Sequence, residues 1–463
     1  MMKLSEAAQV LGVELSGADT EYTAIGLDTR EDLTGKLFVA LRGDNFDAHR
    51  FLADAAARGA VGGIVSKHNE FALPAAWPVI AVEDPRLALG TLASAWRKRF
   101  ALPLIGVTGS NGKTTVKEMC AAILRAWVGD APEQVLATQG NLNNDIGMPQ
   151  MLLRLRPDHR AAVIEMGMNH PGEIAYLAKL AAPTVAVVTN AQRAHLEGMG
   201  ALDAVAKEKG ELFAALGPDG IAAINADDAH CSYWQTLCKN KRVISFGFDA
   251  AAQVRASYQA LPFGSRVVLH TQQGKAEFQL DVPGQHNVRN AAAAAAATLG
   301  AGVSLEAIAK GLNNFSGAKG RLQVRQAKSG ATVLDDTYNA NPDSVRAAID
   351  VLAASTGQKI LVLGDMGEIG EMSAQYHDEI GGYAKSQGID RLYALGEHSA
   401  LAAHNFGAGG EHFDSVEALV AALEPALGPD RVVLVKGSRF MRMERVADAL
   451  ALPLPSDNYS RHK

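Results

Sequence analysis

The sequence is poor in cysteine, in excess charge and in long apolar runs. Its three cysteines, Cys120, Cys231 and Cys238 among 463 residues, have the spacing neither of a disulfide framework nor of a metal site. The formal net charge of −6 argues against nucleic acid as a partner, because no basic excess exists to neutralise phosphates. No run of about 18 apolar residues occurs, so we expect no membrane span, and residues 1–20 lack a signal-peptide pattern. We therefore expect a cytoplasmic protein, and a monomer because no heptad segment demands assembly.

Length and composition indicate a multi-domain globular protein. Hydrophobic residues make up 48% and charged residues 20% of the chain, which provides ample core, and the length predicts about three domains. Apolar runs at 104–107, 161–164, 185–188 and 220–224 alternate with helical segments, the pattern of a parallel sheet covered on both faces. A similar alternation follows from about residue 332.

We predict an α/β fold with three domains. A small N-terminal α/β domain spans 1–100. A central domain spans 101–316, with a mainly parallel sheet and a β-hairpin at 255–282. A doubly wound, Rossmann-like α/β domain spans 317–463, after the turn-rich stretch 315–320.

The most informative segment is Gly-Val-Thr-Gly-Ser-Asn-Gly-Lys-Thr-Thr at 106–115. An apolar run precedes it and a helical segment follows, so its backbone N–H groups and the helix N-terminus form a phosphate cradle. Lys113 would reach the β/γ phosphates, and the Thr114 hydroxyl would face Mg²⁺. Val107 stands where the usual pattern has glycine, and a glycine-rich turn that binds nothing is the alternative. The loop predicts a nucleoside triphosphate site, so we expect residues 101–316 to form a P-loop-type ATPase domain, but it names no reaction.

Single polar residues near this loop are ambiguous. Glu165 ends an apolar run, where a Mg²⁺ ligand or an ordinary strand-end acid is expected. His195 follows the run 185–188, and is either catalytic or structural. Lys207 and Lys209 have the spacing of a solvated helix face, and composition selects neither.

Polar loops suggest where a second ligand binds. The segment 141–149 is dense in amides, although a plain turn would also explain it. Segments 335–342, 364–368 and 436–439 each follow an apolar run. Three polar loops at three strand ends predict a ligand site on the third domain.

Together these motifs resemble the Mur ligase family of ATP-dependent amide ligases. The resemblance rests on Thr108–Thr115, on Gly-Asn-Leu-Asn-Asn-Asp-Ile-Gly-Met-Pro at 140–149, Glu-Met-Gly-Met at 165–168 and Ala-His-Leu-Glu-Gly at 194–198. It rests most on Asp-Thr-Tyr-Asn-Ala-Asn-Pro at 336–342 and Leu-Gly-Asp-Met-Gly-Glu at 363–368. Within the family the motifs are most similar to those of the D-alanyl-D-alanine-adding ligases. The Asp-Asn-Pro-Arg motif of the diamino-acid-adding ligases does not occur.

The resemblance implies roles for individual residues. It implies catalytic roles for Lys113, Glu165, His195 and Lys209. ATP would be held by Gly109, Ser110, Asn111, Gly112, Lys113, Thr114, Thr115, Asn287, Asn290, Arg321 and Asp336. Mg²⁺ would be held by Thr114, Glu165, His195 and, if carbamylated, Lys209. Substrate would be held by Thr29, Arg30, Asn45, His49, Asn141, Asn143, Asn144, Asp145, Tyr338, Asn339 and Asn341.

The implied reaction joins D-alanyl-D-alanine to UDP-N-acetylmuramoyl-tripeptide through an acyl phosphate, with ATP giving ADP and phosphate. Two alternatives remain open. One is another ligase of the family, or a folylpolyglutamate-type ligase, which would use a different acceptor. The other is a P-loop ATPase acting as a motor or regulatory module, which would hydrolyse ATP without consuming an amine.

Overall fold

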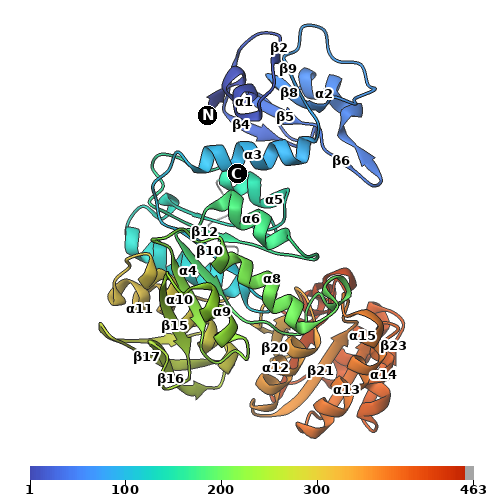
Figure 1. The fold of residues 1–463 in the computed structure, drawn as a ribbon. Helices are drawn as coiled ribbons and strands as arrows, with labels where there is room; N and C mark the ends of the chain where they lie inside the picture. Colours follow the sequence, from blue (N-terminus) through green and yellow to red (C-terminus); the bar gives the residue numbers. More distant parts are fainter. Residues whose placement is uncertain (454–463) are drawn as a thin grey trace.

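The computed structural model describes residues 1–453, whose strands form three main sheets in succession along the chain (Figure 1). The sheets lie within residues 15–82, 104–280 and 323–436. This arrangement confirms the predicted α/β fold with three domains. Residues 454–463 of the predicted third domain lie outside the described residues. No helix within residues 1–453 has both the length and the apolar character needed to span a membrane.

The first sheet has the strand order β2-β9-β8-β5-β4, parallel except for β2. Its strands are β2 (Leu15–Ser16), β4 (Ala24–Gly26), β5 (Lys36–Val39), β8 (Gly62–Ser66) and β9 (Val79–Val82). Short pairs join β1 (Met2–Lys3) to β3 (Glu21–Tyr22) and β6 (Arg42–Gly43) to β7 (Phe46–Asp47). The helices are α1 (Leu4–Leu11), α2 (Leu52–Ala57) and α3 (Pro85–Arg97).

Helix α3 connects the first domain to the second. It begins at Pro85, where the Asp84 carboxylate accepts hydrogen bonds from the N–H groups of Arg86 and Leu87, a strong helix start. Its Leu89 belongs to an apolar cluster that runs from the first sheet into the second without a break. The first two domains therefore share one core.

The second sheet has nine strands in the order β11-β12-β10-β13-β14-β15-β16-β17-β18. Neighbours are parallel as far as β16, and β16, β17 and β18 are antiparallel, as expected for residues 255–282. The strands are β10 (Leu104–Thr108), β11 (Val135–Ala137), β12 (Ala161–Glu165), β13 (Val185–Val188), β14 (Ile221–Asn225), β15 (Arg242–Gly247), β16 (Val254–Leu261), β17 (Gly264–Thr271) and β18 (Gly274–Leu280). The sequence did not predict β11 or β15.

Helices cover both faces of this sheet, as its continuous apolar strands predict. Alternate strand residues pack in two separate clusters, one with α4, α10 and α11, the other with α3, α5, α6 and α8. The helices are α4 (Lys113–Val128), α5 (Gly147–Leu152), α6 (Glu173–Ala181), α7 (Leu196–Met199), α8 (Leu202–Ala214), α9 (Cys231–Leu237), α10 (Gln285–Gly300) and α11 (Leu305–Asn313). The alanines at 291–297 of α10 are all buried, which allows close packing on α4.

The third sheet has the order β19-β20-β24-β21-β22-β23, parallel except for β19. Its strands are β19 (Gln323–Gln326), β20 (Thr332–Asp336), β21 (Gln358–Gly364), β22 (Arg391–Leu395), β23 (Gly410–Phe413) and β24 (Arg431–Lys436). Its helices are α12 (Pro342–Ala353), α13 (Ser373–Ser386), α14 (Ser399–Phe406), α15 (Val416–Leu423) and α16 (Glu444–Leu450). The first three helices pack in one apolar cluster and the last two in another, so this sheet is also covered on both faces.

Candidate functional site

The phosphate loop joins β10 to α4, as the sequence predicts. Gly109 (φ 152°) and Gly112 (φ 81°) both have a positive φ. A Cβ on Gly109 would lie 1.8 Å from Thr189 Oγ1, and one on Gly112 would lie 2.5 Å from Asn290 Oδ1. Glycine is therefore required here by the neighbouring side chains as well as by the turn.

Lys113 is the first residue of α4, and its side chain lies back over the loop. Its Nζ donates hydrogen bonds to the carbonyls of Gly109 (2.8 Å) and Ser110 (3.3 Å). Desolvation lowers the pKa of Lys113, and the nearby Glu165 carboxylate opposes this effect. The amine thus lies where an incoming phosphate would exchange these carbonyl contacts for a stronger, charge-assisted one.

Glu165 is at the C-terminal end of β12 and is 2% exposed. Its Oε1 accepts a hydrogen bond from Asn143 Nδ2 (2.8 Å), while Oε2 is buried without a hydrogen-bond partner. A buried carboxylate oxygen without a partner is costly unless a cation binds it. The residue therefore fits a divalent-cation ligand.

His195 precedes α7 and meets a residue of the third domain. Its Nδ1 lies 3.0 Å from Glu368 Oε2, close enough for an ion pair but poorly aligned for a hydrogen bond. Burial lowers the pKa of His195, whereas Glu368 opposes the shift. Both residues are in the left-handed conformation, with φ 57° and 60°, which non-glycine residues rarely adopt.

The structure distinguishes the two lysines of α8. Lys207 is exposed, whereas Lys209 is 1% exposed. Desolvation, and then the charge of Lys113, lower the pKa of Lys209 well below its ordinary value. Between them, Glu208 is buried and accepts hydrogen bonds from the N–H groups of Gly172 and Ile174. The helix therefore points its second lysine inward rather than presenting a solvated face.

Of the predicted polar loop at 141–149, the structure brings only part to the site. Asn143 reaches Glu165, but Asn144 Oδ1 accepts hydrogen bonds from the N–H groups at the start of α5. Asp145 forms an ion pair with Arg86 (2.9 Å), and Asn141 is exposed.

A cavity of about 690 Å³ opens beside the phosphate loop, between the second and third domains. The predicted nucleotide residues that line it are Thr115, Asn287, Asn290, Arg321 and Asp336, together with Asn111 and Gly112. Arg321 Nη2 lies 3.4 Å from Thr114 Oγ1, and its guanidinium covers the Tyr338 ring at 4.1 Å. Lys436 also lines the cavity. The sequence analysis placed this residue on a ligand loop but predicted no role for it.

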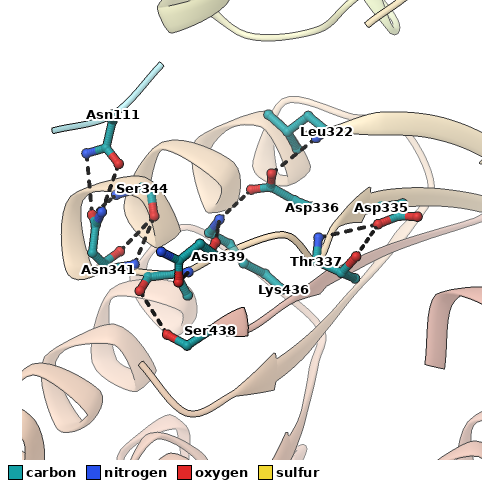
Figure 2. Close-up of polar contacts among 11 residues, drawn as sticks. Asn111, Leu322, Asp335, Asp336, Thr337, Asn339, Asn341, Ser344, Lys436 and Ser438 are labelled. Atoms are coloured by element: carbon teal, nitrogen blue, oxygen red, sulfur yellow. Dashed lines mark hydrogen bonds and ion pairs between the residues drawn. The ribbon is translucent and has the colours of Figure 1, made fainter. Parts of the chain in front are cut away.

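The loops of the third domain make several groups of polar contacts beside this cavity (Figure 2). Lys436 Nζ contacts Asp336 Oδ2 (2.6 Å) and the carbonyl of Asn339 (2.8 Å). Asn341 caps α12 and donates to Asn111 Oδ1 of the phosphate loop (2.8 Å). The ligand edge of the third domain is thus bonded directly to the phosphate loop.

The four first-domain residues that are predicted to hold substrate, Thr29, Arg30, Asn45 and His49, lie apart from this cavity. The cavity is lined by residues from Asn111 onward. Arg30 and Asn45 are exposed, and Thr29 is partly buried. His49 is 3% exposed. Its Nε2 accepts the N–H of Ser66 (2.9 Å) and its Nδ1 lies 2.6 Å from Asp47 Oδ1, so both ring nitrogens have internal partners.

Comparison with known proteins identifies the family. Residues 107–298 match the model of the Mur ligase middle domain, and residues 320–439 that of the Mur ligase glutamate ligase domain. The chain is 43% identical to the UDP-N-acetylmuramoyl-tripeptide--D-alanyl-D-alanine ligase of Escherichia coli (strain K12), over 96% of this chain and 98% of that relative. The chain belongs to the Mur ligase family. This confirms the resemblance that the motifs predicted.

Solved structures of Mur ligases agree with this assignment. The crystal structure of MurF from Acinetobacter baumannii has a TM-score of 0.88 at 37% identity, covering 96% of this chain and 98% of that one. MurF from Thermotoga maritima in complex with ADP has a TM-score of 0.78 at 26% identity, covering 92% and 96%. The three-domain architecture of this Mur ligase is therefore that of its solved relatives.

Two features of the site were not predicted. The sequence placed Glu368 on a ligand loop but did not pair it with His195. It also gave no role to Arg193 or Asp343, which join the second domain to the third. Both contacts cross between domains, and no local pattern signals such a pair.

Proposed function

We propose that this Mur ligase joins D-alanyl-D-alanine to UDP-N-acetylmuramoyl-tripeptide, consuming ATP and completing the pentapeptide precursor of peptidoglycan. The observation that carries the proposal is the bonding of the phosphate loop to the Asp336–Asn341 segment, because it brings an ATP site and a second ligand edge together. The identity of the chain to ligases named for this reaction supports the choice of substrates. We place the enzyme in the cytoplasm, where ATP and nucleotide-linked precursors are available, and treat it as a monomer because one chain supplies every part of the site.

The chemistry follows from the weakness of a carboxylate as an acyl donor. A carboxylate oxygen of the tripeptide attacks the γ-phosphorus, the bond to the β-phosphate oxygen breaks, and ADP leaves. The amine of the dipeptide then attacks the carbonyl carbon of the acyl phosphate through a tetrahedral intermediate, loses its proton and expels phosphate. Two anions must meet in the first step, so Lys113, the loop N–H groups and the α4 N-terminus act by stabilising charge.

We propose a Mg²⁺ site formed by Thr114, Glu165, His195 and carbamylated Lys209. Within residues 1–453, no three His, Cys, Asp or Glu side chains gather in a group able to hold a metal ion, so this site depends on phosphate oxygens and on the modified lysine. The unpartnered oxygen of Glu165 and the low pKa of Lys209 support the proposal, since only a neutral amine reacts with CO₂. The cation supplies further neutralisation of phosphate charge.

We propose that the remaining predicted residues divide between nucleotide and substrates. Asn287, Asn290, Arg321 and Asp336 hold the adenosine end of ATP in the cavity. Tyr338, Asn339 and Asn341 face the acceptor dipeptide, and Asn143 faces the tripeptide. Thr29, Arg30, Asn45 and His49 form the region that binds the uridine diphosphate, with His49 held by Asp47 and Ser66. The functional units are 1–100, 101–316 and 317–463.

The test is phosphate release from ATP and Mg²⁺ with UDP-N-acetylmuramoyl-tripeptide, with and without D-alanyl-D-alanine. We expect release to require both substrates and the product mass to equal the pentapeptide. Release that ignores the dipeptide would refute the choice of acceptor while leaving the nucleotide site in place.

A further inference from the structure

The loop between β13 and α7, residues 189–195, holds the phosphate loop in position. Asn190 accepts a hydrogen bond from the Ser110 N–H (3.0 Å), and its side chain accepts the Asn111 N–H (2.9 Å). Gln192 accepts a hydrogen bond from the Asn111 side chain (2.7 Å) and donates its N–H to Ser110 Oγ (2.9 Å). The conformation of the phosphate loop therefore depends on the conformation of this neighbouring loop.

The same loop is held from the other side by the third domain, through Arg193. Its guanidinium donates to Asp343 Oδ1 from Nε (3.0 Å) and Nη2 (2.6 Å), and its backbone N–H donates to Asp343 Oδ2 (2.8 Å). The guanidinium also lies over the Tyr376 ring at 5.3 Å and 3.9 Å from a Glu379 oxygen. The Arg193 and Asp343 side chains are only 28% and 21% exposed.

These contacts couple two parts of the molecule that must meet during the reaction. Asp343 lies in the first turn of α12, the helix whose cap, Asn341, bonds to Asn111. Because Asp343 holds both the side chain and the backbone of Arg193, docking of α12 fixes the 189–195 loop. That loop in turn fixes Ser110 and Asn111.

We propose that Arg193 is a positioning residue that couples docking of the third domain to the geometry of the phosphate loop. The proposal rests on the proposed ligation, in which the acyl phosphate must be protected from water until the amine attacks. Without the Arg193–Asp343 contact, the third domain docks less often. Some acyl phosphate is then hydrolysed, so that phosphate is released without amide formation.

The test compares Arg193→Ala, Arg193→Lys, Asp343→Ala and the double variant with the parent enzyme. We expect Arg193→Ala to lower kcat for pentapeptide about tenfold, with little change in the KM for the UDP substrate, and to raise the phosphate released per pentapeptide above one. Asp343→Ala also removes the contact to the Arg193 backbone N–H, so it should lose at least as much as Arg193→Ala. The double variant should be no worse than Asp343→Ala alone, and the lysine variant should recover part of the coupling. A purely structural role would lower the melting temperature without changing this ratio.

The matched control is Arg391→Ala, which breaks an exposed ion pair with Glu411 within the third domain. This variant should change neither the kcat nor the ratio of phosphate to pentapeptide. A kcat for Arg193→Ala within twofold of the parent, a phosphate-to-product ratio that stays at one, or additive losses in the double variant would overturn the proposal. If the parent forms no pentapeptide, the proposed function fails instead. Small-angle X-ray scattering with an ATP analogue then tests the contact directly, since Arg193→Ala must be more extended than the parent.

Discussion

Replacing Lys436 with methionine would test how far one buried ion pair stabilises the third domain. Lys436 Nζ lies 2.6 Å from Asp336 Oδ2 and 2.8 Å from the carbonyl of Asn339 (Figure 2). The two charged side chains are 2% and 11% exposed. Methionine keeps the length of the side chain but removes its charge and its donors.

The expected cost follows from the carboxylate that is left behind. Asp336 would keep the hydrogen bond from the Leu322 N–H (3.1 Å) but lose its counter-charge, and breaking a buried pair in this way costs about 3–5 kcal/mol. Because that bond and some solvent contact remain, we expect about 3 kcal/mol. Desolvation lowers the pKa of Lys436 despite the opposing effect of Asp336, so the pair itself is not strongly stabilising. Adding Asp336→Asn should therefore recover at least about 1 kcal/mol.

Hydrogen exchange of the β20 and β24 amides would measure the free energy of opening of this domain without assuming that the whole chain unfolds at once. The matched control is Arg391→Met, in a pair whose side chains are 45% and 48% exposed, which should cost less than about 1 kcal/mol. The reasoning would be refuted if the free energy of opening of Lys436→Met lay within about 0.5 kcal/mol of the parent value. It would also be refuted if the destabilisation of the double variant Lys436→Met, Asp336→Asn equalled the sum of the destabilisations of the two single variants.

Three further predictions concern the site. Lys113→Ala should lower ligation at least about a hundredfold, because the phosphates lose their main counter-charge, with an unchanged melting temperature. Lys209→Ala should be inactive and partly rescued by a short carboxylic acid such as acetate, which replaces the carbamate anion. Burial lowers the pKa of His286 from 6.5 to about 4, so the unfolded chain binds more protons between these values. The free energy of unfolding should then fall by up to about 3 kcal/mol from pH 7 to pH 4, and by less in His286→Gln.

Each of these predictions has a contradicting result. Normal turnover by Lys113→Ala would remove the phosphate-loop assignment. Full activity of Lys209→Ala without any additive would end the carbamate proposal. Urea titrations at pH 7, 5.5 and 4 would test the histidine, and equal acid destabilisation of the parent and His286→Gln would show that another group is responsible.

The parts of the fold and site that the sequence predicted are those with local causes. Gly109 and Gly112 occupy backbone conformations that favour glycine, and strand, loop and helix follow one another along the chain. The continuous apolar runs predicted sheets covered on both faces, because this pattern also lies within each strand's own sequence. Of the two strands missed in the second sheet, β11 (Val135–Ala137) is short and gains its pairing from a neighbour, whereas β15 (Arg242–Gly247) has six residues but lacks a continuous apolar run.

The features that the sequence could not predict depend on contacts between segments that are distant in the sequence. Lys209 is buried because α8 packs against the second sheet, and an alternating charge pattern does not reveal which lysine faces inward. The predicted substrate residues Asn144 and Asp145 also have partners that their local pattern does not reveal, because Asn144 Oδ1 accepts the N–H of Gly147 and Asp145 forms an ion pair with Arg86. The contact of His195 with Glu368 joins residues more than a hundred positions apart, from two domains.

That contact has an evolutionary consequence. His195 and Glu368 both hold a left-handed backbone, which costs an L-residue about 1–2 kcal/mol of steric strain that glycine does not have. Backbone strain alone therefore favours glycine at both positions, so a lineage that keeps the two side chains keeps them for the contact between the two domains or for the chemistry of His195. In a descendant that had given up ligation, these two positions would be among the first to become glycine, which makes them markers of lost activity in a genome.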